Sequence, residues 1–174
     1  MSKATTLSDL QKLINAAVEN GTIEARWEAV AVVDPQLVQQ LTHPDFVPNS
    51  ANASLLASGT PVSPGAASGL LCLSAESVLA ADERGDKTVL VCSETTPADE
   101  IGMRLTEGII TARGGVSSHA AVVARGWGVP AVVGVSSLEI KNDHAIFGGV
   151  KINEGEPISL DGTSGEVFSG FKEV

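Results

Sequence analysis

Apolar side chains recur at helical spacing over the first part of the chain, residues 1–46. Gly21 ends the first run and Thr22 can cap a second helix, which contains Trp27. Asp34 followed by Pro35 indicates an N-cap and first turn, and the third helix should stop before Pro44. Such stripes usually serve internal packing, although this one could also dock a separate partner. The first run is made of Leu7, Leu10, Leu13, Ile14, Ala17 and Val18.

A different pattern begins at residue 60, after small and polar residues at 47–59 that predict a linker. From there to residue 174, short β-branched and apolar runs predict strands separated by turns. Asp161–Gly165 is typical of a hairpin turn. The expected strands are 69–73, 88–92, 109–111, 131–134, 145–152, 157–161 and 166–168.

Two helices are expected among these strands, which makes the fold class α/β. Thr96 and Pro97 open a helix that runs to about Leu105, with Asp99 at a capping-box position. The second helix covers 118–125 and should end at Gly126. We therefore expect a helical N-terminal segment (1–46), a linker (47–59) and a compact domain of strands and helices (60–174).

The segment from Gly108 to Gly128 carries the most specific chemistry. It predicts a short strand, a turn at Gly114 and Gly115, and a helix with His119 in its first turn. The first turn of a helix presents unpaired N–H groups and a positive end, which suits phosphate. The imidazole could thus be a nucleophile whose phosphorylated form is stabilised by the backbone. The alternative is a partly exposed surface histidine on an ordinary strand-to-helix connection.

Several residues around His119 have two interpretations each. Arg113 could steady a phosphate or be a solvated loop charge, and Thr111 could orient the His119 ring or only end a strand. Ser118 could cap the helix and also donate to phosphate, with capping alone favoured. The glycines 114 and 115 allow close approach to the backbone.

The remaining two of the three histidines offer weaker candidates. His43 reads as a helix-end residue. Asp143 and His144 could form an acid–base pair, but neighbours on a strand point to opposite faces, so a turn or surface role is expected. No metal site is expected in this chain.

Composition narrows the class of protein. A net charge of −10 argues against nucleic-acid binding, and no apolar run is long enough for a membrane span. The first residues lack the pattern of a signal peptide. Cys72 and Cys92 lie in expected strands without metal-type spacing, so two free thiols in a reducing, cytoplasmic compartment are expected.

Four segments in order carry a family resemblance. Thr111–Gly126 resembles the phosphohistidine signature of phosphoenolpyruvate-utilising enzymes, T-x-R-G-G-M-T-S-H-A-A-V-V-A-R-G in the pyruvate phosphate dikinases, with Val116 and Ser117 in place of Met and Thr. Pro61–Gly69 is similar to L-P-A-S-P-G-A-A-x-G and Glu94–Met103 to E-T-S-P-E-D-I-x-G-M. Leu41–Pro44 resembles L-L-H-P.

The resemblance implies a swivelling β/β/α domain in which phosphorylated His119 shuttles phosphate. It implies partner domains or subunits: an ATP-grasp nucleotide-binding domain and a (β/α)₈ barrel that binds phosphoenolpyruvate or pyruvate, with Mg²⁺ on the partners. Ser117 aligns with the threonine that is a regulatory phosphorylation site in some dikinases. Neither partner fits within 174 residues, since a barrel alone takes ~250. A subunit, a fragment, and a non-catalytic regulatory or binding module all remain open interpretations.

Overall fold

The computed structural model describes residues 12, 15–19, 21–23, 27, 30–31, 42–47 and 53–174. The chain divides into two compact units, 1–43 and 44–174. In the first unit, residues 15–19 are helical, and Gly21 takes a φ of 69°, as expected for a residue that ends a helix. Leu7, Leu10, Leu13, Ile14 and the expected third helix up to residue 41 lie outside the described residues.

An eight-stranded mixed sheet forms the centre of the second unit, with the order β1-β11-β10-β3-β4-β5-β6-β2. The middle strands β3, β4, β5 and β6 run parallel, and the other pairings are antiparallel. The strands are β1 (Leu55–Ser58), β2 (Thr60–Ser63), β3 (Ala66–Cys72), β4 (Thr88–Cys92), β5 (Gly108–Thr111), β6 (Ala131–Val133), β10 (Pro157–Asp161) and β11 (Glu166–Ser169).

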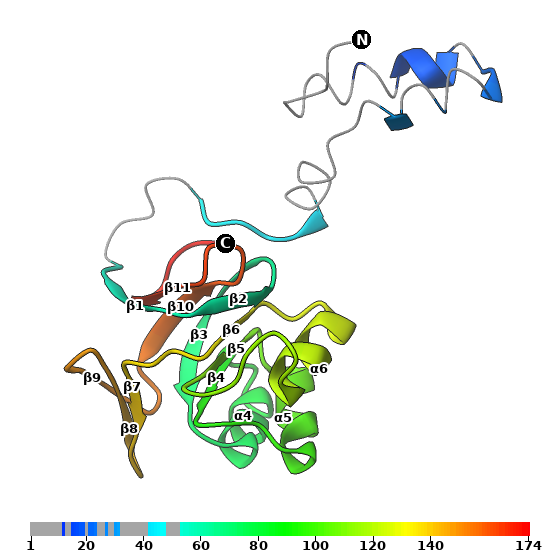
Figure 1. Cartoon of the computed structure of the whole chain (residues 1–174). Coiled ribbons are helices and arrows are strands. Elements are labelled where there is room, and N and C mark those ends of the chain that lie inside the picture. Colours follow the sequence, from blue (N-terminus) through cyan, green and yellow to red (C-terminus); the bar gives the residue numbers. More distant parts are fainter. Residues whose placement is uncertain are drawn as a thin grey trace. The chain divides into compact units, whose positions relative to one another are not determined.

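Two further layers cover this sheet. Helices α4 (Ala75–Asp82), α5 (Glu100–Leu105) and α6 (His119–Trp127) gather on one side, and a single 3₁₀ turn, η1 (Pro97–Asp99), leads into α5. A small antiparallel sheet of β7 (Leu138–Ile140), β8 (His144–Phe147) and β9 (Val150–Asn153) lies on the other side (Figure 1). The unit is therefore of the mixed α/β class with a core built mostly on sheets.

Side chains alternate between the two faces of the central strands, and each face contributes to its own hydrophobic core. Val89, Val91 and Ile110 point to the core shared with the small sheet, while Leu90 and Ile109 pack under the helices. Successive strand residues face opposite sides of a sheet, so a continuous apolar run serves a strand that is buried on both faces. This explains why the central strands are uniformly apolar.

Most of the expected strands are present with small shifts of their ends, and 88–92 and 157–161 coincide with β4 and β10. Asp161–Gly165 does form the turn between the antiparallel strands β10 and β11. The expected single strand 145–152 is wrong. It is a hairpin of β8 and β9, because Gly148 and Gly149 take φ values of 57° and 93° and reverse the chain.

The sequence pattern did not predict several other elements. Strand β1 lies inside the expected linker 47–59 and pairs with β11, while β2, β7 and α4 were not expected. The expected helix 118–125 begins and ends later, because Ser118 is its N-cap and Gly128, not Gly126, takes the left-handed cap with a φ of 72°. No helix in the described part of the chain is long and apolar enough to cross a membrane.

Candidate functional site

Two loops meet at one edge of the central sheet. Strands β4 and β5 are parallel, and Cys92 pairs with Thr111 at their ends, so the loops that follow both strands leave from the same edge. Two more hydrogen bonds continue this pairing beyond the strands: the N–H groups of Ala112 and Arg113 donate to the carbonyls of Cys92 and Ser93, at 3.0 and 2.9 Å. The loop before α5 and the loop before α6 are thus held side by side.

Glycine shapes the loop that leads into α6. Gly114 has a φ of 109°, and a Cβ added there would lie 3.0 Å from the side chain of Ser118. At Gly115 a Cβ would meet nothing within 4 Å, so its surroundings are open. The expected roles therefore divide: Gly114 permits the backbone conformation, and Gly115 leaves space beside the backbone.

The far end of α6 also fixes this loop. The guanidinium of Arg125, in the last turn, donates to the carbonyl of Val116 at 2.7 Å and to that of Val62 at 3.4 Å. One side chain therefore connects the loop, the end of α6 and strand β2. Arg125 was expected only as a cation in the last helical turn.

His119 is the first residue of α6 and is partly exposed. Ser118 caps the helix, since its hydroxyl accepts from the N–H of Ala121 at 3.3 Å. Helix geometry leaves the N–H groups of His119 and Ala120 without acceptors inside the helix. The imidazole thus stands beside free donors and the positive helix end, as its place in the sequence predicted.

Both ring nitrogens of His119 have a partner from the neighbouring loop. The hydroxyl of Thr95 lies 3.0 Å from Nδ1. The carboxylate Oε1 of Glu100, in the first turn of α5, lies 3.6 Å from Nε2. The hydrogen bond with Thr95 therefore orients the ring, and the Glu100 carboxylate lies beside the other nitrogen.

None of the other expected site residues forms a hydrogen bond with the ring. Thr111 is buried and its hydroxyl donates to the carbonyl of Arg113 at 2.6 Å, so it fixes the loop and does not bond to His119. Arg113 is exposed, and among the residues that the structure describes none pairs with its guanidinium. Ser117 is also exposed, two residues before His119.

Sequence reasoning missed Thr95 and Glu100. Thr95 is separated from His119 by 24 positions. Parallel pairing of the strands that precede the two loops was the available signal, because it brings their carboxyl ends together.

Exposed apolar side chains lie along the two helices and the loop that contribute to this site. Ile101 and Leu105 of α5, Val116 of the loop, and Val122 and Trp127 of α6 are all exposed. Arg104 lies over the Trp127 ring, 5.2 Å from its centroid. A surface of this kind around a polar group suits contact with another protein surface.

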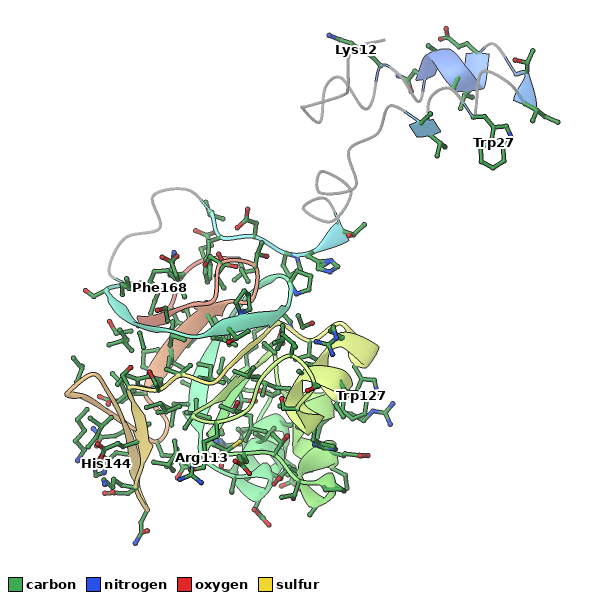
Figure 2. All side chains as sticks on the ribbon, viewed as in Figure 1. Lys12, Trp27, Arg113, Trp127, His144 and Phe168 are labelled. Atoms are coloured by element: carbon green, nitrogen blue, oxygen red, sulfur yellow. The ribbon has the colours of Figure 1, made fainter. Side chains whose placement is uncertain are left out.

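The second histidine candidate lies elsewhere. Figure 2 shows His144 on the small sheet, well separated from Trp127 of α6. Asp143 and His144 do pair, with 2.6 Å between Oδ1 and Nδ1, and this hydrogen bond lowers the pKa of Asp143. Asp143 is exposed in the bend before strand β8, as the expected turn or surface role requires, but the two side chains do not point apart, because Asp143 lies outside the strand.

The two cysteines are free. Burial raises the pKa of the Cys92 thiol to about 12 and also raises that of Cys72, which makes both poor nucleophiles. Within the described residues, no group of three or more His, Cys, Asp or Glu side chains could hold a metal ion.

Comparison with known proteins identifies the family of this chain. Residues 85–165 match the family of the PEP-utilising enzyme, mobile domain. The chain is 43% identical over 170 residues to a pyruvate, phosphate dikinase of Rhizobium meliloti (strain 1021), covering 97% of this chain and 19% of the relative. It is 44% identical over 156 residues to pyruvate, phosphate dikinase 1, chloroplastic, of Arabidopsis thaliana, covering 88% and 16%.

A pyruvate, phosphate dikinase of Clostridium symbiosum is 42% identical over 160 residues, covering 90% of this chain and 18% of the relative. The chain thus spans less than a fifth of the length of the curated relatives it matches. Similarity extends over nearly the whole chain, and the matched family segment contains both loops of the candidate site. The chain belongs to the phosphoenolpyruvate-utilising enzyme family, as its mobile domain, and is related to pyruvate phosphate dikinases.

Proposed function

We propose that this chain is the phosphoryl-carrier domain of a pyruvate phosphate dikinase-like phosphotransferase. His119 accepts a phosphoryl group at one partner site and delivers it at another. The observation that carries this proposal is the placement of a partly exposed imidazole at the N-terminus of α6, within the matched family segment. The relatives are named as dikinases, which favours pyruvate and phosphate chemistry.

Thr95 supports one choice of reacting nitrogen. When the Nδ1 proton is donated to the Thr95 hydroxyl, the lone pair of the neutral ring lies on Nε2. Nε2 then attacks phosphorus in line with the leaving oxygen, and the donor keeps the electron pair of the broken P–O bond. Thr95 is therefore a positioning residue, which holds the tautomer and the ring plane.

The helix terminus stabilises the product. The free N–H groups at the start of α6 and its positive end favour the dianionic phosphoryl group. The open space at Gly115 lets phosphoryl oxygens approach the backbone, and Ser118 keeps the first turn in place. Arg113 is exposed and unpaired among the described residues, so its guanidinium is available to a phosphate.

Transfer between two sites requires docking to two partner surfaces. The exposed apolar residues of α5, α6 and the loop before α6 supply a face for that contact. We propose an ATP-grasp domain at the nucleotide side and a (β/α)₈ barrel at the phosphoenolpyruvate side, as separate domains or subunits, with Mg²⁺ held by these partners. The β/β/α unit would swivel between them, in the cytoplasm.

A two-step transfer experiment tests this function. The purified chain is incubated with ³²P-labelled phosphoenolpyruvate and the isolated barrel domain of a dikinase, and is then separated from both. The labelled chain is added to the ATP-grasp domain with AMP and pyrophosphate. Label on the chain after the first step and in ATP after the second supports the carrier role.

Absence of label, with a barrel domain that phosphorylates its own mobile domain in parallel, would contradict the proposal. It would favour the alternative of a regulatory or binding module without turnover.

Phosphorylation of Ser117 by a protein kinase would inhibit the carrier, because a dianion two residues from His119 repels the incoming phosphoryl group.

A further inference from the structure

One carboxylate lies where the carried group would have to go. Oε1 of Glu100 is 3.6 Å from Nε2 of His119, the nitrogen that Thr95 leaves available. A phosphoryl group bonded to Nε2 brings three oxygens, which share two negative charges, into this same space. Carboxylate and phosphoryl group cannot occupy it together, for reasons of both volume and charge.

We propose that Glu100 is a displaceable gate on His119. In the resting domain its carboxylate lies beside Nε2, while Thr95 holds the ring through Nδ1. When phosphate arrives the side chain swings out to solvent, and it returns when the phosphoryl group leaves. Glu100 thereby lowers the occupancy of phosphohistidine in the free domain and favours delivery to the acceptor.

Exposure and local structure permit this movement. The Glu100 side chain is 49% exposed and makes no hydrogen bond within the described part of the chain, so few contacts hold it in place. Asp99 beside it is different, because its carboxylate accepts from the N–H and hydroxyl of Thr96 at 2.7 and 2.8 Å. Of the two neighbouring carboxylates, only Glu100 can both reach Nε2 and leave.

Among the described residues, no Lys or Arg side chain pairs with the Glu100 carboxylate. Arg104, one turn later on α5, lies over the Trp127 ring instead. The guanidinium of Arg113 pairs with none of the described side chains, although Arg113 belongs to the adjoining loop. The carboxylate charge therefore acts on His119 without a neutralising partner.

The inference rests on the proposed function, since it assumes that His119 takes phosphate. Its test avoids the partner domains by using phosphoramidate as the donor. Nε2 forms the new bond to phosphorus, the P–N bond of phosphoramidate breaks, and ammonia leaves with its electron pair. The ring keeps its Nδ1 proton toward Thr95.

The experiment compares the full wild-type chain with Glu100→Gln and Glu100→Ala. Glu76→Gln on α4 is the matched control, because it makes the same charge change at an exposed first-turn glutamate away from His119. Phosphohistidine is measured by ³¹P NMR at equal phosphoramidate concentration and time. Both Glu100 variants should contain about three- to tenfold more phosphohistidine than wild type, given a like-charge interaction near the surface, and the control should match wild type.

A second measurement distinguishes a local effect of Glu100 on His119 from a general loss of folded structure. The ¹⁵N resonance of Nε2 in unphosphorylated protein should shift in Glu100→Gln, while thermal unfolding is unchanged or only slightly affected. Equal phosphohistidine in all variants, or no phosphorylation of His119 in any of them, would overturn the gate. Labelling by phosphoramidate but not by phosphoenolpyruvate with the barrel domain would instead overturn the proposed function.

Discussion

The hydroxyl of Thr95 lies 3.0 Å from Nδ1 of His119 although the two residues are 24 positions apart. Parallel pairing of β4 and β5 brings them together, because the loops after both strands leave the sheet at the same edge. This contact leaves Nε2 as the nitrogen that faces outward toward Glu100. The ring is thus oriented by a residue outside the histidine signature.

Removing the Thr95 hydroxyl should slow phosphoryl transfer. Thr95→Val keeps the shape of the side chain and loses one hydrogen bond, which corresponds to about 1 kcal/mol and a roughly fivefold lower rate. Thr95→Ser keeps a hydroxyl and should stay near the wild-type rate. Single-turnover transfer from labelled phosphoenolpyruvate measures this difference, and equal rates for both variants would show that Thr95 does not position the ring.

Loss of the α6 cap should reduce stability. Ser118→Ala removes the hydroxyl that accepts from the N–H of Ala121, and we expect a cost of about 0.5–1 kcal/mol in free energy of unfolding, at the low end because the bond is 3.3 Å long. Urea denaturation followed by circular dichroism checks this value. Ser118→Gly should retain more stability than Ser118→Ala, and the reverse order would argue against capping.

A side chain at Gly114 should strain the histidine loop. Gly114→Ala places a Cβ at a φ of 109° and 3.0 Å from Ser118, so we expect a loss of about 1–3 kcal/mol in stability. Gly115→Ala is the matched control, because no positive φ is recorded there and a Cβ meets nothing within 4 Å. If the two variants unfold at the same urea concentration, the conformation at Gly114 is not the constraint described.

High pH should destabilise the fold through Cys92. Burial raises the pKa of this thiol from 9.0 to about 12, so the folded state holds its proton more tightly than the unfolded state does. The resulting stability is fully present below pH 9 and is lost as the pH rises toward 12. The Cys92→Ala variant should lose less free energy of unfolding across this window than wild type does, and parallel pH curves would contradict the assignment.

The sequence predicted those elements whose signals are local. Strands β4 and β10 have bounded apolar runs, and Thr96, Pro97 and Asp99 form the expected capping box at the start of the η1–α5 segment. The place of His119 at a helix start also followed from neighbouring residues. Hairpin β8–β9 was missed because Gly148 and Gly149 were read as part of one strand instead of a reversal.

Elements that depend on distant partners were not predictable in this way. Strand β1, with the sequence Leu-Leu-Ala-Ser, is short and follows small and polar residues that resemble a linker, and pairing with β11 makes it a strand. Thr111 was a reasonable candidate for contact with the ring, but its hydroxyl bonds to the carbonyl of Arg113 inside its own loop. Thr95 and Glu100 could be found only once the strand order was known.

The identity of the phosphorylated residue tests the account most directly. Wild type and His119→Ala are phosphorylated side by side with labelled phosphoenolpyruvate and a dikinase barrel domain, and their folding is compared by circular dichroism. Acid-labile, base-stable label on the wild type, with none on a folded His119→Ala chain, is the predicted result. Equal histidine-bound label on the variant would contradict the assignment of His119 as the phosphoryl carrier.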